Sequence, residues 1–356
     1  MSAAPKLDTG TWKAIDLARE QGTEWAVIAD RFEMNVNTLR ARNSERRRHP
    51  LGRVLTPKVA AWNEREVELP TFVDDAPAIQ AAIAGLRKLG RPAVLGLFSD
   101  HHFGDHDPRA VALHIEVERE LQPDMTVDYG DVADLAALSS YALPASAQRV
   151  DALRAIYPAY TQYTDARCEA SPHTTRIHIT GNHDARVRRR KDDAWFFADQ
   201  IQEAWAALVR SNGRVLWAGW KEEIDIFRLN VRHGWRTNMH AAKSVVENDM
   251  AYGQNVIFGH THRFSAWMKT QKQADKRRRI VQAYNVGYAG NNPPRYEADA
   301  KDSVDWIHGC AFAHVWTDDY LVNITPIIYH ETRRGGMCCV VGKTVIEVDK
   351  QGRRIG

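Results

Sequence analysis

The sequence has few cysteines and no long apolar run, and each shortage excludes a class of protein. Four of the 356 residues are cysteine, and no two of them have the C-x-x-C spacing of a zinc knuckle or a redox motif. No apolar stretch approaches the roughly 20 residues that a membrane-spanning helix needs, and the first 30 residues hold no apolar core of a secretory signal. We therefore expect free thiols in a cytoplasmic protein that does not enter a membrane.

The charge is close to balanced overall but is unevenly placed. The whole chain has a net charge of +3, whereas residues 1–60 hold eleven Lys and Arg against seven Asp and Glu. A composition of 44% hydrophobic and 26% charged residues is that of a globular protein with a sizeable core. The length suggests two domains, or one large domain with an appendage, and the basic part comes first.

Periodicity divides the chain into three parts. Residues 1–49 fit three short helices, and residues 50–90 form a proline-containing linker with an amphipathic helix over 77–89. Residues 91–356 alternate strands and helices and become strand-rich after 213, which predicts an α/β layered sandwich. The expected helices are 109–121, 143–167 and 193–211, and the expected strands are 93–98, 125–129, 176–180, 214–218, 223–232, 255–258, 280–286, 311–316 and 320–328.

The first 49 residues resemble a helix-turn-helix module. Ile28, Phe32 and Leu39 fall where such motifs place their core, although Glu33 stands where the turn usually has glycine. The alternative is a small helical unit for packing or dimerisation. In the DNA-binding interpretation, the third helix lies in a major groove. The residues expected at base edges and phosphates are Asn37, Thr38, Arg40, Arg42, Arg46, Arg47 and Arg48.

Five predicted strands are each followed by a short polar turn. Ligands of open sheets gather at the carboxyl ends of strands, so we expect these turns to meet at one edge. Alternate residues of extended chain point the same way, so Asp100 and His102 can reach one ion, as can His260 and His262. The turns are Ser99–His102, Gly130–Asp131, Gly181–Asp184, His233–Gly234 and Gly259–His262.

The donor types in these turns favour a metal site with catalytic chemistry. Carboxylates, imidazoles and one amide oxygen suit Mn²⁺, Fe or Zn²⁺. The absence of a thiolate argues against a structural zinc site. A single His-x-His is usually a surface strand, but five such blocks in sequence order favour metal binding.

The blocks D-x-H, G-D, G-N-H-D, H-G and G-H-x-H resemble the calcineurin-like metallophosphoesterase superfamily over about residues 92–316. The resemblance implies a four-layer α-β-β-α sandwich and two divalent metal ions, Mn²⁺ ahead of Fe or Zn²⁺. It implies that His183 is not a ligand but protonates the leaving oxygen or holds a phosphoryl oxygen, with Asp184 orienting it. The implied ligands are Asp100, His102 and His262 for one ion, Asn182, His233 and His260 for the other, and Asp131 bridging both.

Longer runs around these blocks are similar to metallophosphoesterases encoded by bacteriophages. The protein-phosphatase branch carries an arginine in a G-D-x-V-D-R-G run, where this chain has Leu135. His101 occupies a position that is usually apolar and is either an outer-shell group or a loop residue, and Trp306 is core or a substrate-stacking residue. The similar runs are 100–108, 130–134 with 139–141, 181–186, 259–263 and Trp306.

These patterns predict a dinuclear metal-dependent phosphoesterase that cleaves a phosphodiester, DNA or a nucleotide, by attack of a hydroxide that bridges the metals. One alternative is a phosphatase of small nucleotides or phosphoproteins, with the first module serving assembly only. Another is a DNA-binding regulator with a vestigial phosphoesterase domain, which the filled ligand positions disfavour. The basic run at 186–191 is either a solvated helix start or a grip on phosphates that flank the scissile one.

Overall fold

The chain divides into two compact units, Met1–Glu66 and Val67–Gly356. The structure, a computed structural model, describes residues 75–135, 151–186, 214–219, 222–235, 240–249, 254–272, 278–291, 305–319 and 321–355, with residues 15, 27, 28 and 30 of the first unit. Ile15 and Ile28 are helical and buried. The residues predicted to contact DNA lie outside the described residues, namely Asn37, Thr38, Arg40, Arg42, Arg46, Arg47 and Arg48.

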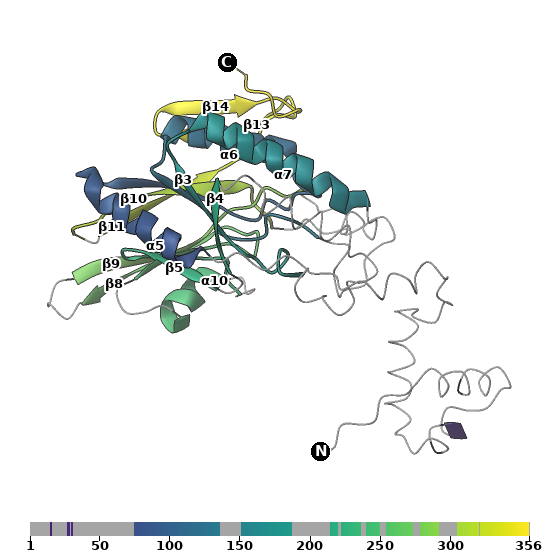
Figure 1. The fold of residues 1–356 in the computed structure, drawn as a ribbon, viewed down its shortest axis with the longest axis horizontal. Helices are drawn as coiled ribbons and strands as arrows, with labels where there is room; N and C mark the ends of the chain where they lie inside the picture. Colours follow the sequence, from purple (N-terminus) through teal and green to yellow (C-terminus); the bar gives the residue numbers. More distant parts are fainter. Residues whose placement is uncertain are drawn as a thin grey trace. The chain divides into compact units, whose positions relative to one another are not determined.

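A six-stranded sheet forms the centre of the second unit (Figure 1). Its strands β1 to β4 run parallel, while β10 is antiparallel to β1 and β11 is antiparallel to β10. In order across the sheet they are β11 (Leu321–Ile328), β10 (Gly309–Trp316), β1 (Ala93–Phe98), β2 (Met125–Asp128), β3 (Thr175–Ile179) and β4 (Val215–Ala218).

A second, five-stranded sheet packs against the first. Its strands β6, β7 and β9 are parallel, and β5 and β8 run antiparallel to their neighbours at the two edges. In order they are β5 (Glu223–Ile226), β6 (Leu229–Arg232), β7 (Asn255–Phe258), β9 (Arg278–Asn285) and β8 (Ser265–Lys272). Leu95 and Leu97 of β1 meet Val231 and Ile257 in the core between the sheets, because alternate residues of each strand point inward.

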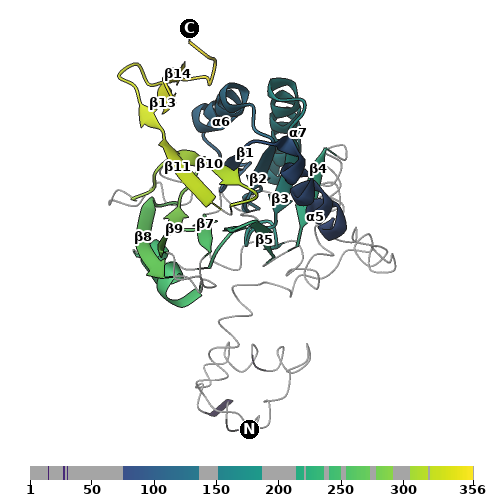
Figure 2. The same ribbon diagram turned by 90° about the vertical axis from the view of Figure 1, so that its left-hand side faces the viewer.

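Helices cover the outer face of each sheet (Figure 2). Helices α6 (Pro108–Leu121) and α7 (Asp151–Ala170) pack on the six-stranded sheet through Val117 and Tyr160. Helix α10 (Ala241–Ser244) and the π-helical turn Val245–Asp249 cover the other sheet. The order of layers is therefore helix, sheet, sheet, helix, and the mixed α/β class expected from the sequence is confirmed.

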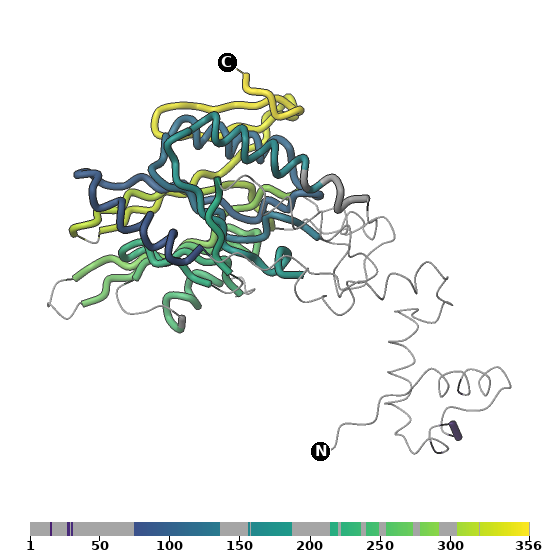
Figure 3. Tube along the Cα trace, viewed as in Figure 1, coloured from purple at the N-terminus to yellow at the C-terminus, as the bar shows by residue number. Residues whose placement is uncertain are grey.

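The remaining elements complete the core. Helix α5 (Ala76–Gly85) and the 3₁₀ turn Leu86–Leu89 add apolar side chains to the layer between the sheets. A three-stranded sheet of β12 (His330–Glu331), β13 (Met337–Val341) and β14 (Thr344–Val348) packs on α6, as the trace in Figure 3 shows. No helix of the described part is long and apolar enough to cross a membrane.

The structure differs from the predicted elements in three places. Residues 223–232 form the hairpin β5–β6 and not one strand, because the chain turns at Phe227, where φ is 56°. Strand β8 was not expected, and most of its residues are exposed, so it lacks the alternation that predicts a half-buried strand. The C-terminal sheet was also not expected. The predicted helix 193–211 lies outside the described residues.

Candidate metal centre

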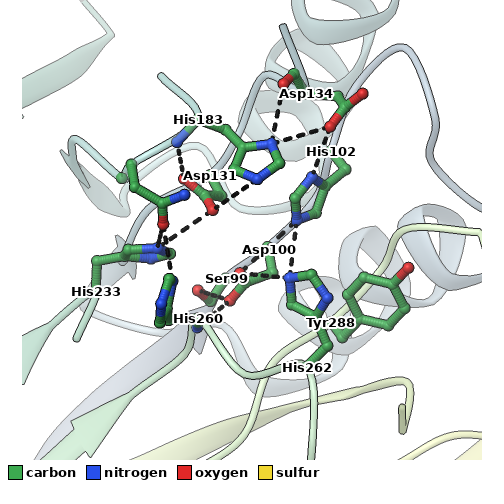
Figure 4. Close-up of polar contacts among 12 residues, drawn as sticks. Ser99, Asp100, His102, Asp131, Asp134, His183, His233, His260, His262 and Tyr288 are labelled. Atoms are coloured by element: carbon green, nitrogen blue, oxygen red, sulfur yellow. Dashed lines mark hydrogen bonds and ion pairs between the residues drawn. The ribbon is translucent and has the colours of Figure 1, made fainter. Parts of the chain in front are cut away.

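The polar turns after β1, β2, β3, β6 and β7 meet at one place, between the carboxyl ends of the two sheets' parallel strands (Figure 4). The structure brings together all seven residues that the sequence analysis assigned as ligands. Their donor atoms form two groups, each within 4.8 Å, that could hold a metal ion, and a third such group, of His102, Asp131 and His183, links the two. The first group is Asp100, His102 and His262, and the second is Asp131, His233 and His260, with Asn182 in contact with the second.

In the first group, three donor atoms face one another. Asp100 Oδ1 is 3.2 Å from His262 Nε2, and the Nε2 atoms of His102 and His262 are 3.1 Å apart. All three side chains are buried. Ser99 Oγ and the backbone N–H of His260 donate to the other oxygen of Asp100, which fixes the carboxylate so that Oδ1 points at the two rings.

In the second group, the amide oxygen of Asn182 lies between two histidines. It is 2.8 Å from His233 Nε2 and 2.8 Å from His260 Nδ1. Asp131 Oδ2 is 3.2 Å from the same His233 nitrogen. The other ring nitrogen of His233 donates to the carbonyl of Tyr129, 3.0 Å away, which sets the ring orientation, as is typical for histidines that bind metals.

Asp131 joins the two groups. Its carboxylate belongs to the His233 group and also lies within 4.8 Å of the ligand atoms of His102 and His183. One carboxylate oxygen accepts a hydrogen bond from the backbone N–H of His183 at 2.6 Å, so the side chain is held in place from the G-N-H-D turn. Asp131 therefore lies between the two sets of donors.

The backbone of the site is held in a conformation that ordinary side chains avoid. Asp100, His102, Asp131, His260 and His262 all have φ between 50° and 73°, in the left-handed region. Non-glycine residues rarely adopt this region, and each instance costs of order 1–3 kcal/mol. Five instances among seven candidate ligands indicate that the fold imposes this backbone to aim the side chains.

Two glycines allow the turns to approach closely. A Cβ on Gly181 would collide with the backbone nitrogen and carboxylate of Asp131. A Cβ on Gly259 would collide with the carboxylate of Asp100 and with Ser99. The G of the G-N-H-D and G-H-x-H blocks is therefore required by contact with a candidate ligand, and not by the turn alone.

The site concentrates negative charge. Burial raises the pKa of Asp100, but its contacts with His102 and His262 outweigh burial and hold the pKa well below its usual range. Burial lowers the pKa of His102 and His233, yet the neighbouring carboxylates raise these pKa values to about 10 and about 9. Protons on these rings balance the carboxylates, which is the balance that bound cations would otherwise provide.

The other two histidines of the groups stay neutral. Burial lowers the pKa of His262 to about 4 in spite of the Asp100 carboxylate. Burial also lowers the pKa of His260, and the charge on His233 adds to that effect. Neutral imidazole is the form of histidine that binds a metal ion.

His183 is oriented by a residue that the sequence analysis did not assign. Its Nδ1 lies 3.0 Å from Asp134 Oδ1, and the same oxygen is 3.2 Å from His102 Nδ1. Asp184, the expected partner, instead accepts hydrogen bonds from the backbone N–H groups of Gly181 and Ala133 at 2.9 and 2.8 Å. The orienting role expected of Asp184 stays a prediction, since its carboxylate contacts the backbone of the turns and not the ring of His183. The carboxylate of Asp184 links the turn after β3 to the turn after β2.

The structure shows the surroundings of His101 and Trp306, for which the sequence analysis left two roles each. His101 is buried and points away from the cluster, with Nε2 2.7 Å from the hydroxyl of Tyr163. Trp306 is partly buried and lies edge-on to the ring of His262, 4.4 Å between centroids. Tyr288 stacks on the same ring at 4.4 Å, a contact that no sequence pattern predicted. Both aromatic residues therefore support a candidate ligand.

The donor set fits a divalent cation. Two facing imidazole nitrogens can share only one proton, and the nearby Asp100 Oδ1, although buried, accepts no hydrogen bond from the described residues. A cation between these three atoms would satisfy all of them at once. Oxygen and imidazole donors without thiolate are those of Mn²⁺, Fe and Zn²⁺ sites.

Comparisons with known proteins give one distant structural likeness. No protein-family model matches the sequence, and no curated protein matches it. The crystal structure of Chaetomium thermophilum Vps29 is similar with a TM-score of 0.34 and 11% identity, over 72% of this chain and 95% of that chain. Its own sheets and helices define the molecule as a mixed α/β protein with clustered His and Asp side chains that could bind metal ions. Its function has to be argued from that cluster.

Proposed function

We propose that this protein is a dinuclear metal-dependent phosphoesterase that hydrolyses a phosphodiester, with DNA or a nucleotide as substrate. The observation that supports this most is the place of Asp131 between two sets of donors. The five sequence blocks that resemble metallophosphoesterases supply all of those donors. Asp100, His102 and His262 would hold one ion and Asn182, His233 and His260 the other, with Asp131 shared.

The residues of the chain divide the work of hydrolysis. Two bound divalent ions, Mn²⁺ in the first instance, would activate a water and neutralise charge on the phosphate. His183 is the proton donor to the leaving oxygen. Its Nδ1 faces Asp134, so the proton would be given from Nε2, which would first exchange its contact with Arg186 Nη2, 2.9 Å away, for a proton from solvent. Asp134 fixes the ring, and general acids of this kind typically contribute roughly 10²–10⁴-fold.

Nucleic acid is proposed as the substrate because of the first unit. Residues 1–60 have an excess of basic residues and a helix-turn-helix-like pattern, which would hold the catalytic unit on DNA. The competing interpretation, a regulator with an inactive second unit, would require a cluster that has lost donors. All seven candidate ligands are present and meet, which favours the enzyme.

A substrate panel with Mn²⁺ tests the proposal. The substrates are bis-p-nitrophenyl phosphate, p-nitrophenyl phosphate, cyclic nucleotides, and single- and double-stranded DNA. We expect hydrolysis of the diesters and of DNA, and none after Asp131→Asn. The matched control is Asp124→Asn. Asp124 directly precedes β2, at the end of the strand away from the site, and its carboxylate pairs with Arg91. Metal-loaded protein that cleaves none of the diesters would contradict the proposal, and preference for the monoester would favour the phosphatase alternative.

A further inference from the structure

The hairpin of β8 and β9 lies at the margin of the second unit and leads away from the candidate metal centre (Figure 2). Strand β8 begins at Ser265, three residues after the candidate ligand His262, and ends at Lys272. Strand β9 begins at Arg278, directly opposite Lys272, and returns toward the centre. The eight residues of β8 rise by about 3.3 Å each, so the far end of the hairpin lies roughly 23 Å beyond the start of β8.

One face of this hairpin passes from the core to solvent along β9. Tyr284 is 5% exposed and packs in the layer between the sheets, and Gln282 donates to the backbone carbonyl of Val322 in β11 at 3.2 Å. Ile280 is 62% exposed, and Arg278 is exposed as well. Because alternate residues of a strand share a face, these four residues belong to one face, and its outer part is open to solvent.

The side chains on this outer part are cationic and apolar. Lys272 and Arg278 are both exposed and lie directly opposite each other. Like charges in this position destabilise a pair of strands, and strands β7, β8, β9 and β11 contain no Asp or Glu to offset them. Met268, 52% exposed, lies with Ile280 on the same face beside the two cations. The charge of this face is therefore complementary to an anionic partner.

The distance from the metal centre favours one kind of anion. Along each strand of duplex DNA the phosphate charges recur about every 3.4 Å of the helix axis, so 23 Å corresponds to roughly seven base pairs. A duplex of this length is stiff, since its persistence length is about 150 base pairs. A duplex held at the centre can therefore present phosphates at a fixed distance from it, whereas a single nucleotide cannot reach the hairpin.

We propose that the outer face of the β8–β9 hairpin, through Lys272 and Arg278, binds the phosphate backbone of duplex DNA whose scissile phosphate lies at the candidate metal centre. This proposal rests on the proposed phosphoesterase function and narrows its substrate to a duplex long enough to reach the hairpin. Two other basic stretches, residues 187–191 and 273–277, lie outside the described residues and are no part of this surface.

The first test measures binding without turnover. The full chain is titrated in EDTA into a fluorescent duplex of about 30 base pairs at several salt concentrations, and anisotropy is recorded. For the double variant Lys272→Gln with Arg278→Gln we expect weaker binding to all sequences alike and a plot of log K against log salt that is flatter by about 2, because each phosphate contact contributes about 0.9. The matched control is Arg333→Gln with Lys343→Gln, which removes the same charge from two exposed positions of the C-terminal sheet.

A salt dependence and a DNA affinity equal to those of the control would overturn the proposal. A lipid surface is the other anionic partner that such a face could meet, so the variants are also sedimented with vesicles that contain phosphatidylserine. Loss of vesicle binding in the hairpin variant, with unchanged DNA binding, would overturn the proposal in favour of a membrane contact.

The second test is kinetic and separates this proposal from the proposed function. In the Mn²⁺-loaded hairpin variant, KM for a long duplex should rise, whereas kcat and KM for bis-p-nitrophenyl phosphate should stay as in the wild type, because so small a diester cannot span the distance. Equal KM values for the duplex in variant and wild type would overturn the proposal. A wild-type protein that binds DNA through the hairpin but cleaves no diester would contradict the proposed function and leave the binding role of the hairpin standing.

Discussion

Two buried sets of charged residues lie close to strands β1 to β3, one under the helices and one beyond the carboxyl ends of the strands, and they are built in opposite ways. The first lies between the six-stranded sheet and helices α6 and α7. There Glu118 and Asp128 are nearly inaccessible, and each accepts hydrogen bonds from Arg167, while Arg176 also donates to Glu118. Every carboxylate of this set meets an arginine of the chain itself.

The second set is the candidate metal centre. Among the described residues, the ion pairs of Asp100 and Asp131 are made only with histidines. A histidine can lose its proton and offer a lone pair instead, whereas an arginine cannot. The difference indicates that the arginine-paired set is complete as folded and stabilises the packing of helices on the sheet, whereas the histidine-paired set could hold metal ions.

The backbone shows the same contrast. Glu118, Asp128, Arg167 and Arg176 lie in regular helices and strands. The candidate ligands lie in turns, and five of them have positive φ. Strain of this kind persists where the surrounding structure over-determines it, and it is concentrated at functional sites.

The largest effect is expected from removing the shared carboxylate. Asp131→Asn should abolish hydrolysis of bis-p-nitrophenyl phosphate, because it weakens both groups of donors at once. The fold should persist, since Asp131 pairs with no arginine or lysine among the described residues. Circular dichroism and Mn²⁺-dependent turnover check the two expectations. Wild-type turnover in this variant would show that Asp131 does not join the groups.

His183→Ala separates chemistry from metal binding. We expect hydrolysis to slow by roughly 10²–10⁴-fold while metal content stays the same. The loss should be smaller for substrates with good leaving groups, which need little protonation. Metal analysis accompanies the kinetics. If metal content collapses, His183 is itself a ligand. Its ring nitrogen lies within 4.8 Å of donor atoms of His102 and Asp131, which would explain that result.

A substitution in the arginine-paired set should lower the free energy of unfolding and leave metal content unchanged. Arg167→Met would leave Glu118 and Asp128 buried without their main partner, at a cost of about 3–5 kcal/mol in the free energy of unfolding. Urea denaturation measures this. The control is Arg214→Met. It breaks an exposed ion pair with Asp165, which lies in α7 like Arg167, and should cost about 0–1 kcal/mol in the free energy of unfolding. If the two substitutions lowered the free energy of unfolding equally, the buried arginine-paired set would stabilise the fold no more than an exposed ion pair does.

The smallest expected effect is a pH dependence. Burial holds the pKa of His114, beside the arginine-paired set, well below its usual value, and Arg167 adds to the shift. The unfolded chain therefore binds this proton more readily, so its contribution to stability is present above about pH 6.5 and is lost as the pH falls. Each such histidine changes the free energy of unfolding by at most about 1.4 kcal/mol per pH unit.

Urea denaturation at several pH values between 5 and 7.5 checks this expectation. His114→Leu should flatten the acid side of the stability curve, whereas His330→Gln, a change at an exposed residue of β12, should leave it as in the wild type. A stability curve that His114→Leu leaves unaltered would show that the unfolded and folded chains bind this proton alike.

The sequence predicted the site better than it predicted the support of the site. Strand β1 has the predicted bounds, and β2, β3 and β7 lie within one residue of theirs, because short apolar runs bounded by polar turns mark buried parallel strands. The turns that follow them hold every candidate ligand except His233, which follows β6. The order of strands and turns along the chain was enough to predict that these ligands meet, since parallel strands bring their carboxyl ends to one edge of a sheet.

Contacts between turns could not be predicted in this way. Asp134 and Asp184 stand at similar distances along the chain from a candidate ligand, and only the folded arrangement shows which of them meets His183. The arginine-paired set was missed because Glu118 and Arg167 read as polar positions of amphipathic helices. Strand β8 was missed because exposed residues dominate it, and the left-handed backbone of the ligands has no signature in residue type.

The most direct test of the account is the metal content of the purified full chain after loading with Mn²⁺ and removal of free ions. Inductively coupled plasma mass spectrometry should find two ions per chain in the wild type and fewer in Asp131→Asn, with the arginine-paired variant Arg167→Met unchanged wherever it remains folded. A wild-type protein that retains no metal, or an Asp131→Asn variant that retains two ions, would contradict the claim that these histidines and carboxylates form a dinuclear centre.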